Sequence, residues 1–302
     1  MKIIDKFIEY LYMPICRNYV RYILNDKPAD IVVRSLCVPY FLYLHHYWPR
    51  FNPPRSFSEK IFHRMFYNRD PLLTQISDKL CVRDYVAQKV GADYLVPLLW
   101  HGNNPEDIPF NNLPKKFALK TNHGCGYNII VQDKTNLDVD LTKRQLYNWL
   151  NKNFCTESFL GLPWAYKNIK PTIIIEALVD DNGKLPLDYK FFCYSGSAEY
   201  LLMTFDRFGD LEEKHFDRHY KPLNLWNGAP QHEKKIEKPI NYEEMLRLAD
   251  TLSQDFDFIR VDLYSVGERI YFGELTCYPA GGMARFIPKE YDFVFGEKWN
   301  LK

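Results

Sequence analysis

The spacing of apolar residues changes near residue 94. Before it, apolar residues recur every three or four positions, as in amphipathic helices; after it, short β-branched and aromatic runs alternate with turn residues, as in strands. Helical spacing returns at 142–154 and at 241–254, where Asn241 is a predicted N-cap with Glu244 three residues on. Because so few helices separate the strands, we predict an antiparallel α+β fold. The predicted strands are YLVPLLW, KFALKTN, YNIIVQD, PTIIIEAL, DYKFFCYS, EYLLMTF, FIRVDLYS and RIYFGELT.

Residues 56–91 read as two helices. Ser56 is a predicted N-cap, with Glu59 at the capping-box position three residues later. Pro71, which follows an aspartate, breaks the first helix, and Gly91 ends the second.

Residues 2–25 form a mildly basic amphipathic pattern, which predicts one helix or a helix pair. Two interpretations stay open: this segment packs against the rest of the protein, or it lies on an anionic membrane surface. Asp5 and Glu9 interrupt what would be the apolar region of a secretory signal. No apolar run approaches the roughly 20 residues of a spanning helix.

Composition and charge narrow the class of protein. The chain has 302 residues, of which 46% are apolar, and a formal net charge of +1. This is a globular composition, and it gives no electrostatic reason to expect nucleic acid as a partner. The seven cysteines are scattered without zinc-ligand spacing. We therefore predict a reducing, cytoplasmic location.

A lysine and a glycine loop form the first candidate site. Lys120 ends a predicted strand, and the loop that follows contains His123, Gly124 and Gly126. Backbone amides of such a loop can hold phosphate oxygens, and a lysine supplies the countercharge. An ordinary hairpin turn with a structural histidine is the alternative. Glu176, at the end of an apolar strand, is either a solvated strand end or a clamp on ribose hydroxyls.

Acidic and basic residues on the later strands form the second candidate site. Asp262 and Glu274 lie on two strands joined by a short turn, so hairpin pairing would set them side by side, with Thr276 on the same face. Two adjacent carboxylates are a site for Mg²⁺, or they pair with Arg260 or Lys190 on an exposed sheet face. Lys190 shares a strand face with Asp188, and both Lys190 and Arg207 are candidates to bind an anion.

The order of these elements resembles the TupA-like ATP-grasp family, which is associated with bacterial cell-surface polysaccharide synthesis. The resemblance covers roughly residues 50–295. It is carried by PPRSFSEKI, SDKLCVRDYV, FALKTNHGCGYNIIV, YKNIKPTIIIEAL, DYKFFCYSG, DRFG, FIRVDLY and YFGELTCYPAGG.

The resemblance implies an ATP-grasp fold, in which two α+β subdomains grip ATP between antiparallel sheets. The implied division is a helical N-terminal extension at 1–50, a helical region at 51–113, a lid subdomain at 114–178 and a C-terminal subdomain with the metal site at 179–302.

The resemblance also implies a role for each candidate residue. ATP would contact Lys120, the loop residues His123, Gly124 and Gly126, and the strand residues Glu176, Ala177 and Leu178. Lys190, Arg207 and Arg260 would be catalytic. Asp262, Glu274 and Thr276 would hold Mg²⁺, although the superfamily usually has asparagine at the position of Thr276. Gly281 and Gly282 would admit the substrate carboxylate.

The implied activity is that of an ATP-dependent carboxylate–amine ligase acting through an acyl phosphate. Its substrates would be a uronic-acid carboxylate of a surface polysaccharide or its precursor, and an amino acid or amine. Two alternatives stay open: a sugar kinase on the same fold, and a glycosyltransferase of polysaccharide synthesis. The implied location is cytoplasmic, with peripheral contact to the inner membrane as an open alternative.

Overall fold

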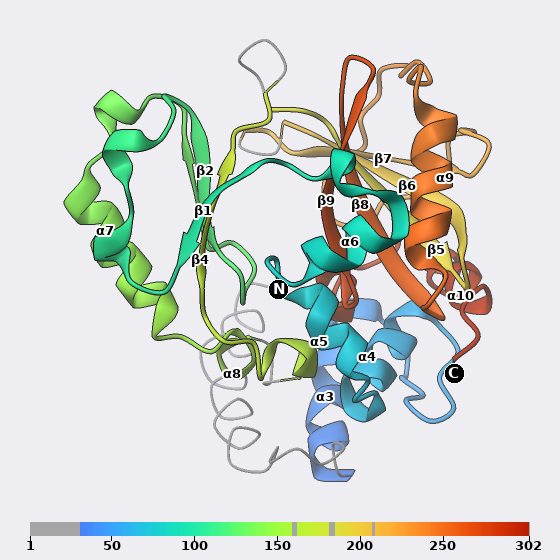
Figure 1. Ribbon diagram of the computed structural model, residues 1–302. Coiled ribbons are helices and arrows are strands. Elements are labelled where there is room, and N and C mark those ends of the chain that lie inside the picture. The colour runs from blue at the N-terminus through green and yellow to red at the C-terminus, as the bar shows by residue number, and fades with distance from the viewer. Residues whose placement is uncertain (1–30, 159–161, 181–184, 207–208, 302) are drawn as a thin grey trace.

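The computed structural model describes residues 31–158, 162–180, 185–206 and 209–301. Its strands form two sheets, a four-stranded one in the order β1-β4-β2-β3 and a five-stranded one in the order β7-β6-β5-β8-β9. Every pair of neighbouring strands within them is antiparallel. The predicted α+β class is confirmed, and the two sheets lie on opposite sides of the molecule (Figure 1).

The smaller sheet consists of β1 (Leu98–Gly102), β2 (Phe117–Thr121), β3 (Asn128–Val131) and β4 (Ile173–Ala177). Its outer face is apolar, and α7 (Val139–Leu150) covers it (Figure 1). Phe117, Leu119 and Ile175 pack there against Leu146 and Trp149 of α7. Because side chains alternate along a strand, Ala118, Lys120 and Glu176 are left on the inner face.

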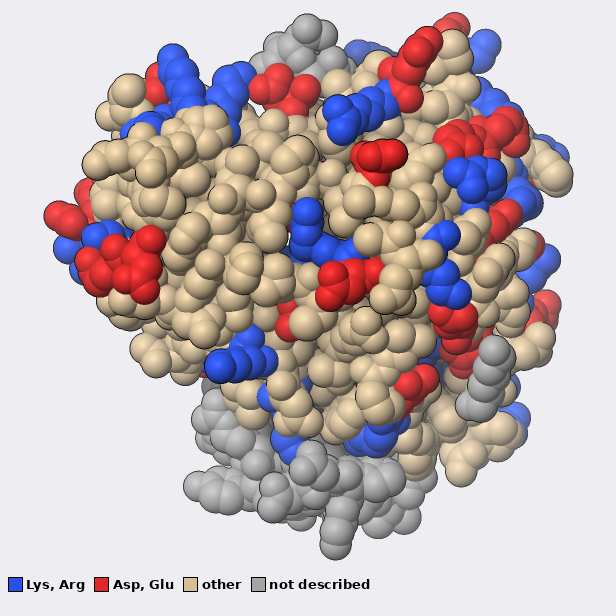
Figure 2. All heavy atoms as spheres, in the orientation of Figure 1, with Lys and Arg blue, Asp and Glu red and all other residues tan. Residues whose placement is uncertain are grey.

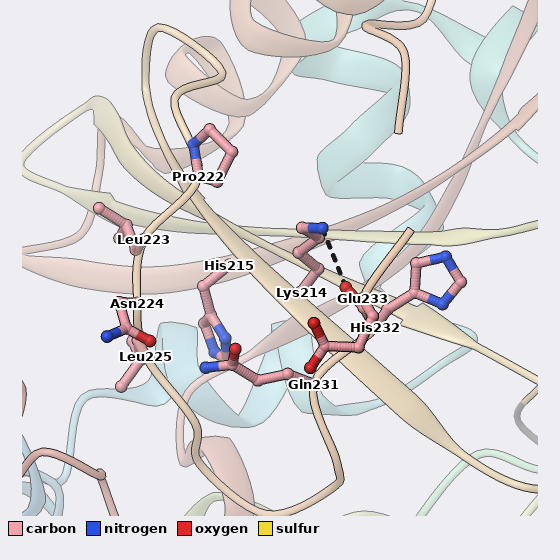
Figure 3. A pocket seen from close by; sticks show the side chains of 9 residues that line it. All are labelled: Lys214, His215, Pro222, Leu223, Asn224, Leu225, Gln231, His232 and Glu233. Atoms are coloured by element: carbon pink, nitrogen blue, oxygen red, sulfur yellow. Dashed lines mark hydrogen bonds between the residues drawn. The ribbon is translucent and has the colours of Figure 1, made fainter. Parts of the chain in front are cut away.

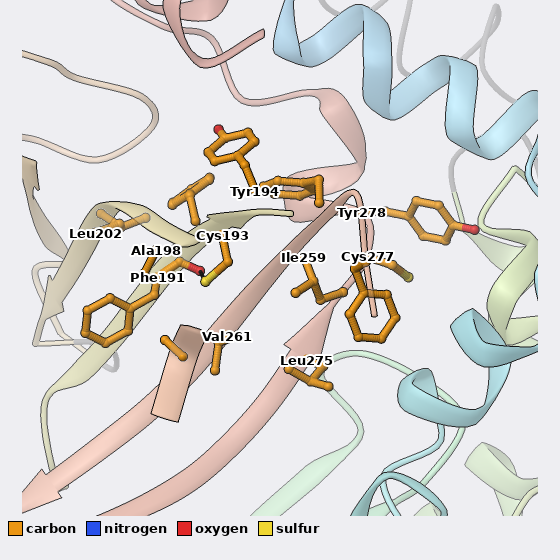
Figure 4. Close-up of a cluster of buried hydrophobic side chains, with 14 of the residues drawn as sticks. Phe191, Cys193, Tyr194, Ala198, Leu202, Ile259, Val261, Leu275, Cys277 and Tyr278 are labelled. Carbon is orange, nitrogen blue, oxygen red and sulfur yellow. Dashed lines mark hydrogen bonds between the residues drawn. The ribbon is translucent and has the colours of Figure 1, made fainter. Parts of the chain in front are cut away.

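The larger sheet consists of β5 (Asp188–Tyr194), β6 (Ser197–Phe205), β7 (Glu212–Asp217), β8 (Phe258–Val266) and β9 (Arg269–Thr276). The helix α9 (Tyr242–Ser253) packs on β5, β6 and β8. Phe191 and Val261 belong to the buried cluster on this sheet (Figure 4). The same alternation places Lys190 and Asp262, the neighbours of these two residues, on the opposite face.

Helices from both ends of the described chain pack together beside the larger sheet. They are α3 (Ile31–His45), α4 (Phe57–Tyr67), α5 (Pro71–Ser77), α6 (Val82–Val90) and α10 (Glu290–Glu297). α10 packs on α4, α5 on β9, and α6 on α9. At the centre, the buried guanidinium of Arg64 binds the Asp257 carboxylate, donates to the Cys277 carbonyl at 3.2 Å and lies 4.3 Å from the Trp299 ring centroid. These contacts join the first described helices to the end of the chain.

Shorter helical segments complete the description. They are the α-helix α8 (Phe154–Glu157) and the 3₁₀ segments Ala92–Tyr94, Pro105–Asp107, Phe110–Asn112, Lys134–Asn136, Trp164–Tyr166 and Pro279–Gly282.

Local signals predicted most of these elements, and three predictions need correction. The Ser56–Glu59 capping box is present, but the single helix predicted after Pro71 is two helices, α5 and α6. Asp78 separates them, because its carboxylate accepts hydrogen bonds from the backbone of Leu80 and Cys81. Asn241 does not cap α9 with its side chain, which bonds Ser265 at 2.9 Å instead. The strand β7 and the helix α10 were not predicted.

Other expectations meet the structure only in part. Residues 2–25, with their predicted helix, lie outside the described residues. In the described ranges, no helix has both the length and the apolar character needed to cross a bilayer. The cysteines that the structure describes are free thiols.

Candidate active site

A cavity of about 750 Å³ lies between the two sheets. Basic and acidic side chains lie next to each other in the hollow between the two halves (Figure 2). The volume of this cavity falls in the range of cofactor and substrate pockets, roughly 300–1,000 Å³. Its lining includes Lys120, Glu176, Ala177 and Leu178 from the candidate residues, with Val96, Pro186, Asp188, Thr204, Asp206 and Tyr264 beside them.

Glu176 is the centre of a charged group on the smaller sheet. It is buried, and its Oε2 lies 2.6 Å from Lys120 Nζ. Its Oε1 lies 2.7 Å from Nη1 of Arg83, a residue of α6 that also donates to the Val96 carbonyl at 2.9 Å. β2 and β4 pair Ala118 with Glu176, which brings Lys120 and Glu176 to the same face. Glu176 is therefore an anchor for two cations and not a solvated strand end.

Lys79 is a third cation of this group, and sequence reasoning did not single it out. Its Nζ donates to the Gly124 carbonyl, and its backbone N–H donates to the Asn122 carbonyl at 3.2 Å. Burial lowers the pKa of Lys79, while the Glu274 carboxylate acts in the opposite direction. The Lys79 ammonium therefore interacts electrostatically with charged residues of both sheets, Lys120 on the smaller and Glu274 on the larger. We call Lys79, Arg83, Lys120 and Glu176 the small-sheet cluster.

The glycine loop lies beside Lys79. A Cβ at Gly124 would come 2.6 Å from the Tyr127 ring, and Gly126 has a φ of +77°, so both positions require glycine. His123 is buried, with Nε2 3.1 Å from the Trp149 carbonyl oxygen, and burial lowers the pKa of its imidazole. The loop is anchored by these contacts, and its three candidate residues are not in the cavity lining.

Asp262 is the centre of a second charged group, on the larger sheet. Only 2% of this residue is exposed, and its two oxygens lie 2.7 and 2.6 Å from the guanidinium of Arg260. Lys190 Nζ lies 3.3 Å from Asp262 Oδ2 and 3.1 Å from Asp188 Oδ2. Burial raises the pKa of Asp262, but Arg260 and Lys190 outweigh it and hold that pKa below its usual value. Asp262 is therefore ionised despite its burial.

The predicted juxtaposition of Asp262, Glu274 and Thr276 is present. β8 and β9 pair Asp262 with Glu274 and Arg260 with Thr276. Arg260 Nη2 lies 3.2 Å from Glu274 Oε1 and 3.1 Å from Thr276 Oγ1, and that hydroxyl donates to Glu274 Oε1 at 3.0 Å. We call Asp188, Lys190, Arg260, Asp262 and Glu274 the large-sheet cluster.

The donor set of the large-sheet cluster fits a hard divalent cation. Mg²⁺ is bound in proteins through one or two carboxylates, with phosphate and water completing its shell. Asp262 and Glu274 supply two adjacent carboxylates, and Thr276 adds a hydroxyl. In the part of the chain that the structure describes, no group of three or more His, Cys, Asp or Glu could hold a metal ion. A divalent cation here would share the carboxylates with Arg260.

A smaller pocket of about 130 Å³ adjoins the large-sheet cluster. Lys190 and Arg260 form one side of it, and Gly282 contributes to another. Ala280, Gly281 and Gly282 have φ values of 47°, 60° and 71°, a left-handed run that bends the backbone toward this pocket. A Cβ at Gly282 would come 3.1 Å from Ile61 and Phe62, so only glycine fits there. Arg207 lies outside the described residues.

A third pocket, of about 240 Å³, lies between β7 and the loop that follows it (Figure 3). His215 and Gln231 line it, and Lys214 Nζ donates to the His232 carbonyl at 2.9 Å. His215 is almost fully buried, and burial lowers its pKa to about 4. Its imidazole is therefore neutral at physiological pH.

Comparisons with known proteins agree with the motif analysis. A family model described as TupA-like ATPgrasp matches residues 59–300. A search of curated proteins found no match.

Several solved structures have a similar fold. One is the D-alanine–D-alanine ligase from Bacillus anthracis complexed with ATP, with a TM-score of 0.42, 14% identity, and coverage of 68% of this chain and 57% of the ligase. Another is the phosphoribosylamine–glycine ligase from Thermotoga maritima, with a TM-score of 0.42, 10% identity, and coverage of 71% and 52%. A third is the N5-carboxyaminoimidazole synthase from Aspergillus clavatus, with a TM-score of 0.37, 13% identity, and coverage of 67% and 44%. The matched part of this chain thus covers between 44% and 57% of the length of these three proteins.

Proposed function

The chain belongs to the TupA-like ATP-grasp family, and from this premise we propose that it is an ATP-dependent carboxylate–amine ligase. A carboxylate attacks the γ-phosphate of ATP, which gives an acyl phosphate and ADP. An amine then displaces the phosphate and forms an amide. Catalysis of both steps depends on positioning the reactants and on neutralising spread negative charge.

The single observation that carries the proposal is a cavity of nucleotide size between the two sheets, lined by Lys120 and Glu176 of the small-sheet cluster and by Asp188 of the large-sheet cluster. Ala177 and Leu178 supply backbone and apolar surface for the adenine ring, and Glu176 lies at its edge. Lys79 and Lys120 would hold the phosphates nearest the ribose, with the 122–127 loop above them. Lys190 and Arg260 would neutralise the transferred phosphate. In this scheme residues 114–178 act as the lid and residues 179–302 as the base of the site.

Asp262, Glu274 and Thr276 are the residues that would hold Mg²⁺. The ion would supply charge neutralisation to the phosphate oxygens of the nucleotide. The chain's own contribution is to keep Asp262 ionised through Arg260 and Lys190. The Ala280–Gly282 turn would bring the substrate carboxylate to Lys190 and Arg260, because it lines the same small pocket as these two cations.

The family resemblance supports a uronic acid of a surface polysaccharide, or its precursor, as the carboxylate substrate. An amino acid or simple amine would be the second substrate. With these substrates the protein would act in the cytoplasm, with peripheral contact to the cytoplasmic face of the inner membrane as the open alternative.

The test is to incubate the full chain with ATP, Mg²⁺, galacturonic or glucuronic acid, and a panel of L-alanine, L-serine and ethanolamine. We expect ADP release that requires the acid, and a new amide detected by mass spectrometry. A phosphomonoester formed without amine would identify a sugar kinase. Glycosyl transfer without ATP consumption would identify a glycosyltransferase. ADP release indifferent to every acid would contradict the proposal.

A further inference from the structure

Glu213 of β7 faces the active site, although β7 lies at the far edge of the larger sheet. β7 pairs Glu213 with Thr204 of β6, and β6 pairs Thr204 with Asp188 of β5. Residues in one such row point to the same face of a sheet, so Glu213 shares the face of Asp188 and Lys190. It lines the 130 Å³ pocket together with Lys190 and Arg260.

Among the described residues, no cation forms an ion pair with the Glu213 carboxylate. Its Oε2 is buried, and no described group donates a hydrogen bond to it. Burial raises the pKa of Glu213 above its usual value and outweighs the backbone hydrogen bond from Ala229 and the charges of Lys190 and Arg260, which lower it. Both cations are already bound to carboxylates of the large-sheet cluster. A buried carboxylate in this position is costly unless a ligand satisfies it.

The other walls of the pocket are suited to a cation with a small organic group. Phe57, Phe192 and Phe286 line it, and the Phe57 ring centroid lies 5.8 Å from that of Phe192 and 6.0 Å from that of Phe286. Aromatic faces attract ammonium groups, and apolar walls pack against the carbon atoms that carry them. The volume of about 130 Å³ admits only a few heavy atoms.

We propose that this pocket is the subsite for the primary ammonium group of the amine substrate, with Glu213 as its counter-ion and proton acceptor. The proposal rests on the ligase function proposed above and names a subsite for the second substrate. Lys190 and Arg260, on the pocket wall, would hold the acyl phosphate next to the bound amine.

The chemical step balances with the groups present. The ammonium gives one proton to Glu213 and becomes a neutral amine. Its nitrogen lone pair then forms the C–N bond at the acyl carbon. The bond between that carbon and the phosphate oxygen breaks, and phosphate leaves with the electron pair and the second amine proton. Glu213 returns its proton to water.

Glu213→Gln removes the charge and keeps the shape. We expect it to raise the KM for L-alanine and ethanolamine by at least about tenfold, because a charged hydrogen-bond partner is lost. Hydroxylamine is uncharged at neutral pH and needs no counter-ion, so hydroxamate formation should stay within about twofold of the wild type. Glu213→Asp should recover part of the amine KM. The matched control is Glu212→Gln, since Glu212 bonds His232 at 2.5 Å outside this pocket.

Two measurements separate this inference from the ligase proposal. If the wild type forms no hydroxamate with any acid, the ligase function fails. If it does, and Glu213→Gln leaves the KM of both amines unchanged or slows hydroxylamine equally, the subsite is wrong. Calorimetric titration of ethylammonium chloride into both proteins, with potassium chloride as the ionic control, needs no turnover. Binding that is absent from the wild type, or equal in both, would also overturn the subsite.

Discussion

Both charged clusters contribute residues to the lining of the same cavity, but they have opposite balances of charge. The small-sheet cluster sets three cations, Lys79, Arg83 and Lys120, against the single carboxylate of Glu176. Counted over the described residues alone, the large-sheet cluster sets two cations, Lys190 and Arg260, against the carboxylates of Asp188, Asp262 and Glu274. One half therefore has positive charge to spare, and the other has a surplus of negative charge.

Because of this difference in charge, the two clusters are suited to different ligands. Spare cations held by hydrogen bonds are suited to phosphate oxygens. A surplus of carboxylates is suited to a metal ion, since adjacent like charges repel unless a cation lies between them. A nucleotide with its metal would complete both halves at once. Substitutions in the small-sheet cluster should therefore raise the KM for ATP, and substitutions in the large-sheet cluster should lower kcat and the dependence on Mg²⁺.

Asp262→Asn should have the largest effect. It removes the central carboxylate of the large-sheet cluster and leaves Lys190 and Arg260 without a common partner. We expect kcat to fall by about 10²–10³-fold, the range for loss of one key electrostatic group. The thermal shift with ADP and Mg²⁺ should become independent of Mg²⁺. Asp250→Asn, which disturbs an ion pair with Arg218 elsewhere, is the control. A thermal shift of the Asp262→Asn variant that still depends on Mg²⁺ would contradict the assignment of the metal ion to the large-sheet cluster.

Lys120→Met tests the small-sheet cluster. It removes one cation from the cavity, while Arg83 continues to bind the buried Glu176. We expect the KM for ATP to rise by about 10–100-fold with a smaller change in kcat, because a charged hydrogen bond to the nucleotide is lost. Lys116→Met is the matched control, since Lys116 pairs with Asp180 and does not line the cavity. Equal KM values in the two variants would contradict the assignment.

Acid should destabilise the larger sheet through the buried imidazole of His215. The pKa of His215 falls from 6.5 to about 4 on folding, so its stabilising contribution is present above pH 6.5 and is lost as the pH falls toward 4. At pH 5 the free energy of unfolding should be lower than at pH 7 by about 2 kcal/mol from this residue alone. Denaturant unfolding of the wild type and His215→Gln at both pH values measures it.

The His215→Gln variant separates the pH effect of His215 from the effects of two other buried residues with shifted pKa values. His45 also has its pKa lowered to about 4, whereas burial raises the pKa of Asp292 to about 6, and these two act in opposite directions on acidification. Both are unchanged in His215→Gln. An identical pH dependence of the two proteins would show that His215 is not the source of the acid sensitivity.

Thr276→Ala should have the smallest effect. The hydroxyl of Thr276 bonds Arg260 and Glu274 but carries no charge. We expect a change in kcat of about threefold, in line with the roughly 0.5–1.5 kcal/mol of a neutral hydrogen bond. A loss as large as that of Asp262→Asn would mean that the hydroxyl contributes as much to the metal site as the Asp262 carboxylate does.

The sequence predicted the strands that have strong apolar patterns, and with them the large-sheet cluster and half of the small-sheet cluster. Asp262 and Glu274 could be placed side by side because a short hairpin fixes their register. By contrast, β7 has the sequence EEKHFD, in which charged residues hide the strand pattern. Glu213 was missed with it. An edge strand can be this polar because it pairs on one side only.

Contacts between segments that are far apart in the sequence were the other feature that could not be predicted. Lys79 and Arg83 belong to the helical region, and nothing in their local pattern shows that they meet Gly124 and Glu176. The same holds for Asn241, whose side chain bonds Ser265 and does not cap its own helix. Local rules predicted which elements form. They could not predict which side chains from distant segments would complete the site.

The Arg64 centre has a consequence for how the protein is made. Arg64 meets Asp257 and Cys277, which lie 193 and 213 residues away, and Lys60 on the same helix donates to the Trp299 carbonyl, 239 residues away. During synthesis, α4 emerges long before these partners do. Its buried arginine must wait until these partners have been made, so the main core cannot close before residue 299 has been synthesised. Such long-range contacts make folding slow, and a nascent chain in that interval exposes apolar surface that chaperones recognise.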